Sequence, residues 1–136
     1  MEEEKYSKLF TRIKAAFVDA LELIILMYSA TEIFNLIEMI PNYIRICVFV
    51  FLFLLYEPIL ISVFGATVGH FFNDIVVKRD GDEQKNVLFP KAIFRFIFKF
   101  FLGWVSLLTI SSNEKRKAIH DYVGGSVVLN FNRIKT

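Results

Sequence analysis

The sequence has one cysteine, one tryptophan and three prolines in its 136 residues. A single cysteine excludes a disulfide within the chain and a cluster of thiolates around a metal. Cys47 lies in an apolar run, so we expect its thiol to be buried and inert. The net charge of only +2 provides no long-range attraction for nucleic acid. A disulfide-stapled, thiolate-metal or nucleic-acid-binding domain is therefore not expected.

Signals for catalysis are also missing from the sequence. It has no glycine-rich phosphate loop, no cluster with metal-ligand spacing and no nucleophile suitably spaced from a base. His120 and Asp121 are adjacent, and neighbouring side chains on a helix point about 100° apart. We expect this pair to cap a helix, or to pair with Arg12 or the basic run 115–117. The sequence therefore predicts neither an enzyme nor a cofactor or metal site.

Apolar and aromatic residues, by contrast, are abundant. Hydrophobic residues make up 55% of the chain, sixteen residues are phenylalanine, and the mean hydropathy is +0.50. An ordinary soluble domain of this length does not need such a composition. We therefore expect residues 1–136 to form a single all-α membrane domain with phenylalanines facing lipid.

Two segments are predicted to cross the bilayer. Residues 44–66, as a helix, would rise roughly 34 Å against a hydrocarbon core of about 30 Å. Residues 14–34 form the other expected span, although this segment contains acidic residues. The chain begins without a short apolar core that ends in a small-residue cleavage site, so we expect the first span to be retained.

Residues 90–112 form a third apolar segment of a different kind. Lys91, Arg95 and Lys99 recur every four residues and share one face of a helix, as in an amphipathic helix at the membrane surface. We expect this helix to bend at Gly103 into a shallow re-entrant piece. The alternative is a complete third transmembrane span in which Arg95 and Lys99 snorkel or are paired.

The distribution of basic residues predicts the orientation. Four lie before or at the start of the first span, four lie in 67–91 and five lie in 115–135, whereas the loop between the spans has Arg45 alone. Basic loops prefer the cytoplasm. We therefore expect an integral protein of the cytoplasmic (inner) membrane, with its N-terminus and its C-terminus in the cytoplasm.

Short cytoplasmic β-strands are expected between these segments. The sequence DIVVKRDGDEQKNVLF, residues 74–89, reads as two strands around an Asp80-Gly81 turn. The sequence GGSVVLNF, residues 124–131, is a third candidate strand. Together they could form a small sheet under the membrane.

Charged residues inside the predicted spans require an explanation, because such groups are costly in a bilayer unless they are paired or hydrated. Arg12, Asp19 and Glu22 follow the spacing of one helical face. The rise per residue puts both acids in the cytoplasmic half, at a depth similar to that of Glu57 in the second span. The nearest expected counter-charges are Arg95 and Lys99.

Three interpretations of this cluster remain open. The charges could be a brace of ion pairs, such as Arg12 with Asp19, or the third segment with Glu57. The carboxylates could instead form a hydrated site that binds and releases a proton or a small cation. They could also contact a separate partner protein. All three interpretations use the same residue types in the same places, so the sequence does not separate them.

Three separated blocks of the sequence resemble the RDD family of membrane proteins. In order, they are RIKAAFVDALEL, FGATVGHFFNDIVVKRDG and KRKAIHDYVGGSVVL. The arginine and the two aspartates that give the family its name match Arg12, Asp19 and Asp121. The resemblance implies an integral membrane protein of unassigned function, with transport, including sodium/proton exchange, suggested for some members. It does not imply an enzyme.

The chain departs from the family pattern at a few positions. His70 stands where lysine is usual, Asn73 where a small residue is common, and Gly125-Ser126 where Gly-Thr is more usual. These changes question the role of a basic group at position 70, but they leave the named triplet intact.

Two classes of function follow as expectations. In the first, an oligomer translocates protons or sodium ions, with Asp19, Glu22 and Glu57 as the titrating groups. In the second, the chain is an accessory or assembly subunit of a larger membrane complex, and the buried charges are structural braces. Both classes require the lipid bilayer and a protein partner, which is either a second copy of the chain or another subunit.

Overall fold

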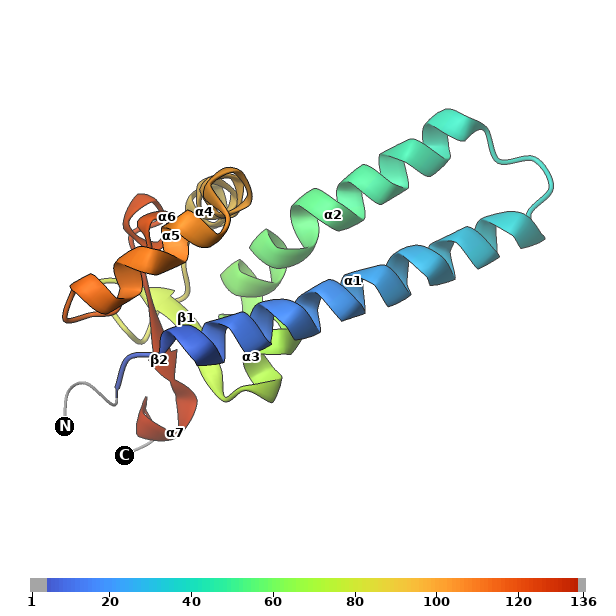
Figure 1. Cartoon of the computed structure of the whole chain (residues 1–136). Helices are drawn as coiled ribbons and strands as arrows, with labels where there is room; N and C mark the ends of the chain where they lie inside the picture. The colour runs from blue at the N-terminus through green and yellow to red at the C-terminus, as the bar shows by residue number, and fades with distance from the viewer. Residues whose placement is uncertain (1–4, 135–136) are drawn as a thin grey trace.

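The computed structural model describes residues 5–134, which are mostly helical. Helices α1 (Leu9–Leu36) and α2 (Asn42–Phe64) form a long hairpin that projects from a smaller base (Figure 1). The base contains the remaining elements, which are α3 (Val68–Phe72), β1 (Ile75–Arg79), α4 (Phe89–Leu102), α5 (Trp104–Leu108), the 3-10 helix η2 (Thr109–Ser112), α6 (Ile119–Val123), β2 (Ser126–Asn130) and α7 (Phe131–Ile134).

The helices differ in how well they suit a bilayer. Among the described residues, α2 is the one unbroken helix long and apolar enough to span a membrane, with 23 residues and a mean hydropathy of 2.5. Helix α1 has 28 residues, but Asp19, Glu22 and Glu32 are spread along it, so it does not reach that standard. The predicted span over residues 44–66 therefore corresponds to a helix that could cross a membrane, whereas a crossing by α1 stays a prediction.

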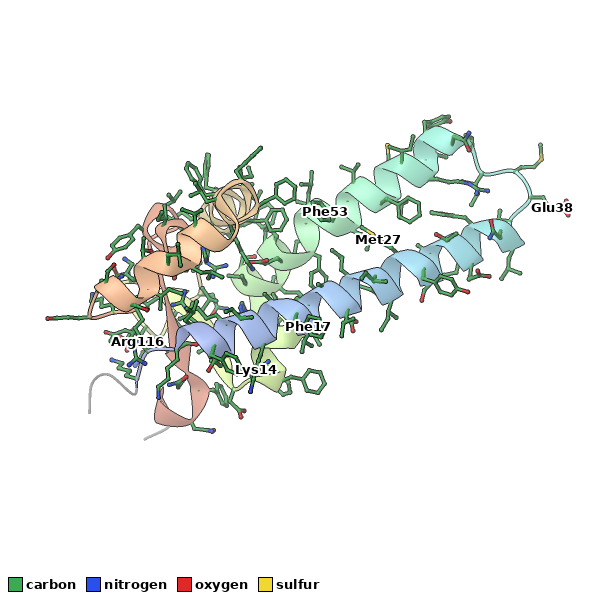
Figure 2. The ribbon with its side chains drawn as sticks, in the orientation of Figure 1. Lys14, Phe17, Met27, Glu38, Phe53 and Arg116 are labelled. Carbon is green, nitrogen blue, oxygen red and sulfur yellow. The ribbon has the colours of Figure 1, made fainter. Side chains whose placement is uncertain are left out.

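The third apolar segment bends where the sequence predicted. Helix α4 ends at Leu102, Gly103 has a positive φ of 50°, and the chain continues at 100° to α4 as a broken span or a re-entrant loop. Figure 1 shows α4 nearly end-on, so it lies across the foot of the hairpin. Phe53 of α2 packs edge-to-face against Phe96 and Phe100 of α4, with ring centroids 5.9 and 5.5 Å apart (Figure 2).

The two strands pair in an arrangement that the sequence did not predict. Strand β1 runs antiparallel to β2, with Ile75 opposite Asn130 and Arg79 opposite Ser126. The expected strand after the Asp80-Gly81 turn is wrong, because in the described chain residues 82–88 make only an isolated bridge, from Asp82 to Arg79. Strand β2 buries four consecutive residues when it pairs with β1. The segment DEQKN, residues 82–86, has no apolar side chain, so pairing it with β1 would bury less apolar surface.

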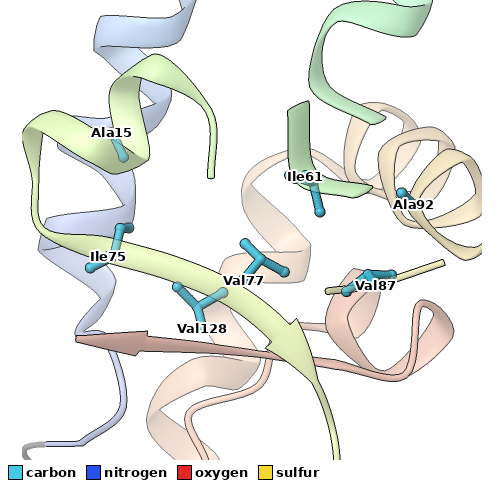
Figure 3. Packing of buried hydrophobic residues seen from close by; sticks show 7 residues of the cluster. All are labelled: Ala15, Ile61, Ile75, Val77, Val87, Ala92 and Val128. Carbon is cyan, nitrogen blue, oxygen red and sulfur yellow. The ribbon is translucent and has the colours of Figure 1, made fainter. Parts of the chain in front are cut away.

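A small apolar core lies at the foot of the hairpin and joins it to the sheet (Figure 3). Its residues come from α1, α2, α4, both strands and the loop before α4. Its members are Ala15, Ile61, Ile75, Val77, Val87, Ala92 and Val128. The sheet therefore fixes the position of α1 relative to α2 and α4 where the charged residues meet.

Beyond this core, the hairpin leaves much of its apolar surface uncovered. Phe17, Ile24 and Phe51 are each more than half exposed. Cys47 is exposed as well, so the expectation of a buried thiol is wrong. Among the elements that the structure describes, Figure 1 shows α1 alone beside this outer part of α2.

Candidate functional site

The first link of the site joins the two ends of the sequence. Arg12 lies in the first turn of α1 and is 6% exposed. Its Nη1 donates to Oδ2 of Asp121, and its Nη2 donates to the carbonyl oxygen of Arg116 at 2.6 Å. Asp121 is fully buried, and its Oδ2 also accepts from the backbone N–H of Ala118 at 3.0 Å, which caps α6. Arg12 therefore ties α1 to α6.

A second arginine continues the chain of charges toward α2. Arg95 of α4 is 2% exposed, and its Nε lies 3.2 Å from Oδ1 of Asp121. Its Nη1 donates to Oε1 of Glu57 at 2.9 Å. Lys99, one turn further along α4, donates to both oxygens of Glu57 at 3.0 and 2.8 Å. Each carboxylate is thus held between two basic side chains.

We call these five side chains the charge network: Arg12, Asp121, Arg95, Glu57 and Lys99. They come from four helices, α1, α2, α4 and α6, and meet at the foot of the hairpin. Three cations face two carboxylates, so with all five ionised the network has a formal charge of +1. Such buried pairs are costly to desolvate, and removing one partner leaves the other charge without compensation.

Asp19 is outside the charge network and has a different task. Its Oδ2 accepts from the hydroxyl of Thr67 at 2.6 Å, and its Oδ1 accepts from the backbone N–H of Gly69 at 2.8 Å. A Cβ atom on Gly69 would lie 2.0 Å from the carbonyl oxygen of Ala15, so only glycine allows α3 to approach α1 this closely. Asp19 therefore fastens α3 to α1 and does not pair with Arg12.

Glu22 is the predicted site residue that the structure does not bring into these contacts. It is half-buried on α1 and makes no hydrogen bond or ion pair with the residues that the structure describes. The expected three-carboxylate cluster is therefore divided among an ion-paired Glu57, a hydrogen-bonded Asp19 and an unengaged Glu22.

Two buried histidines beside the charge network are neutral at pH 7. Burial, and after it the nearby cations of Lys99 and Arg95, lower the pKa of His70 to about 3. Burial also lowers the pKa of His120 to about 3, although the carboxylate of Asp121 opposes the shift. For Asp121 itself, burial alone would raise the pKa, but Arg12 and Arg95 outweigh it and hold the pKa well below its usual value.

His120 also contacts a serine, but the arrangement does not suit nucleophilic catalysis. Its Nδ1 lies 2.6 Å from Oγ of Ser106, and that oxygen accepts from the backbone N–H of His120 at 3.1 Å. The Nε2 of His120 lies 3.6 Å from Asp121. The side chain of Ser106 is fully buried. No group of three or more potential metal ligands occurs in the described part of the chain either.

The two lysines of the basic run 115–117 pair with Asp80. Lys115 and Lys117 donate to the two oxygens of Asp80 at 2.9 and 2.6 Å, and these hydrogen bonds lower the pKa of Asp80. This contact ties the turn after β1 to the loop before α6. It lies nearer the surface than the charge network.

Sequence reasoning missed Thr67, Gly69 and Ser106. The available signal for the first two was the short run GATVG, in which a threonine in an N-cap position precedes a helix. Nothing in the sequence indicated that the N-terminus of this five-residue helix would face Asp19.

A model of the RDD family matches residues 6–125 of the chain. The match includes all five residues of the charge network, together with Asp19. Neither a curated protein nor a solved structure matches the sequence.

Proposed function

The chain belongs to the RDD family, and we propose that it is a non-enzymatic, accessory membrane subunit whose charge network braces the fold. The observation that carries this proposal is the position of Glu57 and Asp121, each between two basic side chains. In this role the exposed apolar faces of the hairpin contact lipid and a larger membrane complex.

The charge of the network argues against a cation site at Glu57. Both oxygens of this carboxylate accept hydrogen bonds from Lys99, and one also accepts from Arg95. A sodium ion would have to displace these donors and would remain beside the cations of Arg95 and Lys99. Like charges at such distances repel strongly where water is scarce.

A second candidate function is translocation of protons or sodium ions by an oligomer. The observation that favours it is the set of contacts that Asp19 and Glu22 make. Asp19 accepts hydrogen bonds from neutral donors, and Glu22 has no hydrogen-bonding or ion-pairing partner in the described chain. Two or three membrane helices do not easily form a pathway alone, so this function requires several copies.

We place the protein in the cytoplasmic (inner) membrane with both ends of the chain in the cytoplasm. The segment before α1 lies against β2, where the N–H of Ser7 donates to the carbonyl oxygen of Val128 at 2.9 Å. The start of α1 and the last strand therefore share the base, at the opposite end from the loop that contains Glu38 (Figure 2). The basic loops belong to this same end.

Reconstitution into liposomes separates the two functions. We expect the wild-type chain to produce no proton movement above that of empty liposomes when sodium or potassium is added outside. The Asp19→Asn and Glu22→Gln variants should give the same background signal. Internal pH is followed with a fluorescent dye, and a cation/proton-exchanging ionophore added at the end shows that the liposomes are intact.

The opposite result would be cation-driven proton movement in the wild type that disappears in Asp19→Asn without loss of folded protein. That result would establish translocation and overturn the accessory role. For the accessory role, crosslinking through the exposed Cys47 in native membranes should yield an adduct with a different protein. Free monomer alone would contradict it.

A further inference from the structure

A cavity of about 380 Å³ lies beside the charge network. One part of its wall is basic and contains Arg12, Arg95 and Lys99, together with the two neutral histidines, His70 and His120. Another part is apolar and is formed by Ile13, Ala16, Phe17, Ala20 and Leu107. Among the described residues that line the cavity, none is acidic. Its volume lies within the range of about 300–1,000 Å³ that is usual for ligand pockets.

Two buried side chains in the basic wall, Arg12 and His70, each have a nitrogen that has no hydrogen-bond partner among the described residues. Nε of Arg12 is buried and has no hydrogen-bond partner within the described chain. Nδ1 of His70 accepts from the backbone N–H of Thr67 at 3.3 Å, so the proton of the neutral ring is on Nε2. The structure gives this second nitrogen no acceptor among the described residues. Both side chains are more than nine-tenths buried, so bulk water does not satisfy these donors.

The apolar wall follows one face of α1 toward the lipid-facing part of the hairpin. Ala16 and Ala20 are one turn apart, and their small side chains leave room between α1 and α5. Phe17, at the edge of the same face, is 65% exposed. The cavity therefore joins a buried basic wall to an apolar surface on the hairpin.

We propose that this cavity binds an anionic phospholipid, with the phosphate at the basic wall and the start of an acyl chain along Ala16 and Ala20. The charge network has an excess of one positive charge, and one phosphodiester group neutralises it. Guanidinium groups and a histidine N–H are suitable donors for phosphate oxygens. A free inorganic anion would use the basic wall but leave the apolar wall in contact with water. This inference is independent of the accessory role.

Native mass spectrometry of the full chain, released from detergent, tests the proposal. The probes are phosphatidylglycerol and phosphatidylcholine with identical acyl chains, and inorganic phosphate as a competitor. We expect one phosphatidylglycerol to remain bound per chain, with phosphatidylcholine binding about tenfold more weakly, which corresponds to about 1.4 kcal/mol. Millimolar phosphate should not displace the lipid.

Filling the cavity should remove this lipid and leave the charges in place. Ala20→Leu projects into the apolar wall from α1, and Leu107→Trp fills the cavity from α5. Each is expected to lower phosphatidylglycerol occupancy about tenfold, whereas Ala30→Leu, further along α1, should bind as the wild type does. The second filling variant is used if the first does not fold.

Three results would overturn the proposal. Equal binding of the two lipids would show that the basic wall does not select an anion. Unchanged binding in a folded filling variant would place the lipid elsewhere on the surface. Displacement of the lipid by inorganic phosphate would make the site one for a free anion.

Discussion

Replacing Asp121 by asparagine is expected to lower the free energy of unfolding in detergent by about 3–5 kcal/mol. The carboxylate compensates Arg12 on one side and Arg95 on the other, and it is fully buried. An amide of the same size leaves two guanidinium groups facing each other without an intervening negative charge. It also removes a charged cap from α6. Denaturant-induced or thermal unfolding, followed by circular dichroism, measures the loss.

Asp80→Asn is the matched control for this substitution. Asp80 also lies between two cations, Lys115 and Lys117, but its side chain is 27% exposed, whereas that of Asp121 is fully buried. Surface ion pairs contribute about 0–1 kcal/mol, so the control should remain close to the wild type. If the Asp121 variant were as stable as this control, burial of the ion pairs would have no role in holding α1, α4 and α6 together.

Lowering the pH from 7 to 5 is expected to destabilise the protein by about 4 kcal/mol, roughly 2 kcal/mol from each buried histidine. The pKa of both His70 and His120 is lowered to about 3 in the folded chain. Below the usual pKa of about 6.5, the unfolded chain therefore binds protons that the folded chain does not. Stability is fully present above pH 6.5 and falls as the pH decreases. The carboxylate of Asp121 does not contribute in this window, because its pKa is lowered too.

His120→Asn separates this effect from other causes of acid lability. The asparagine oxygen can accept from the hydroxyl of Ser106, and the variant loses one of the two histidines that bind a proton on unfolding, while His70 remains. The slope of stability against pH between 7 and 5 should therefore fall by about half. A wild-type protein of constant stability across that interval would contradict neutral, buried histidines.

Charge and periodicity were sufficient to predict several partners in the charge network. Lys91, Arg95 and Lys99 recur with helical spacing, and an amphipathic helix with this stripe had to face the acid of a neighbouring span. The structure does bring Arg95 and Lys99 to Glu57. Both were expected as counter-charges because desolvated charges need compensation, and this requirement does not depend on the details of packing.

The partner of Asp19 could not be predicted in this way. Its donors are a threonine hydroxyl and a backbone N–H, which leave no charge signal in a sequence. They lie on a five-residue helix whose position depends on Gly69 fitting against Ala15. Arg12 was expected to pair either with Asp19, as a brace, or with Asp121 and the histidine before it. It pairs with Asp121, because β2 brings the end of the chain beside α1.

The sheet illustrates the same difference between local and tertiary information. The Asp80-Gly81 turn is a strong local signal for a hairpin, and Arg79 and Asp82 do form a bridge there. Strand β2 nevertheless replaces the local candidate as the partner of β1, because Val127, Val128 and Leu129 become buried when they pair. The strand propensity of a short segment does not include the free energy gained from this burial.

A double-mutant cycle on Glu57 and Lys99 tests most directly whether the charge network holds the fold together. The unfolding free energies of the wild type, Glu57→Gln, Lys99→Gln and the double variant are measured in the same detergent. Paired charges predict that the double variant is more stable than the sum of the single losses implies, with a coupling of about 1–3 kcal/mol. Single losses that add to within about 0.5 kcal/mol would contradict the brace.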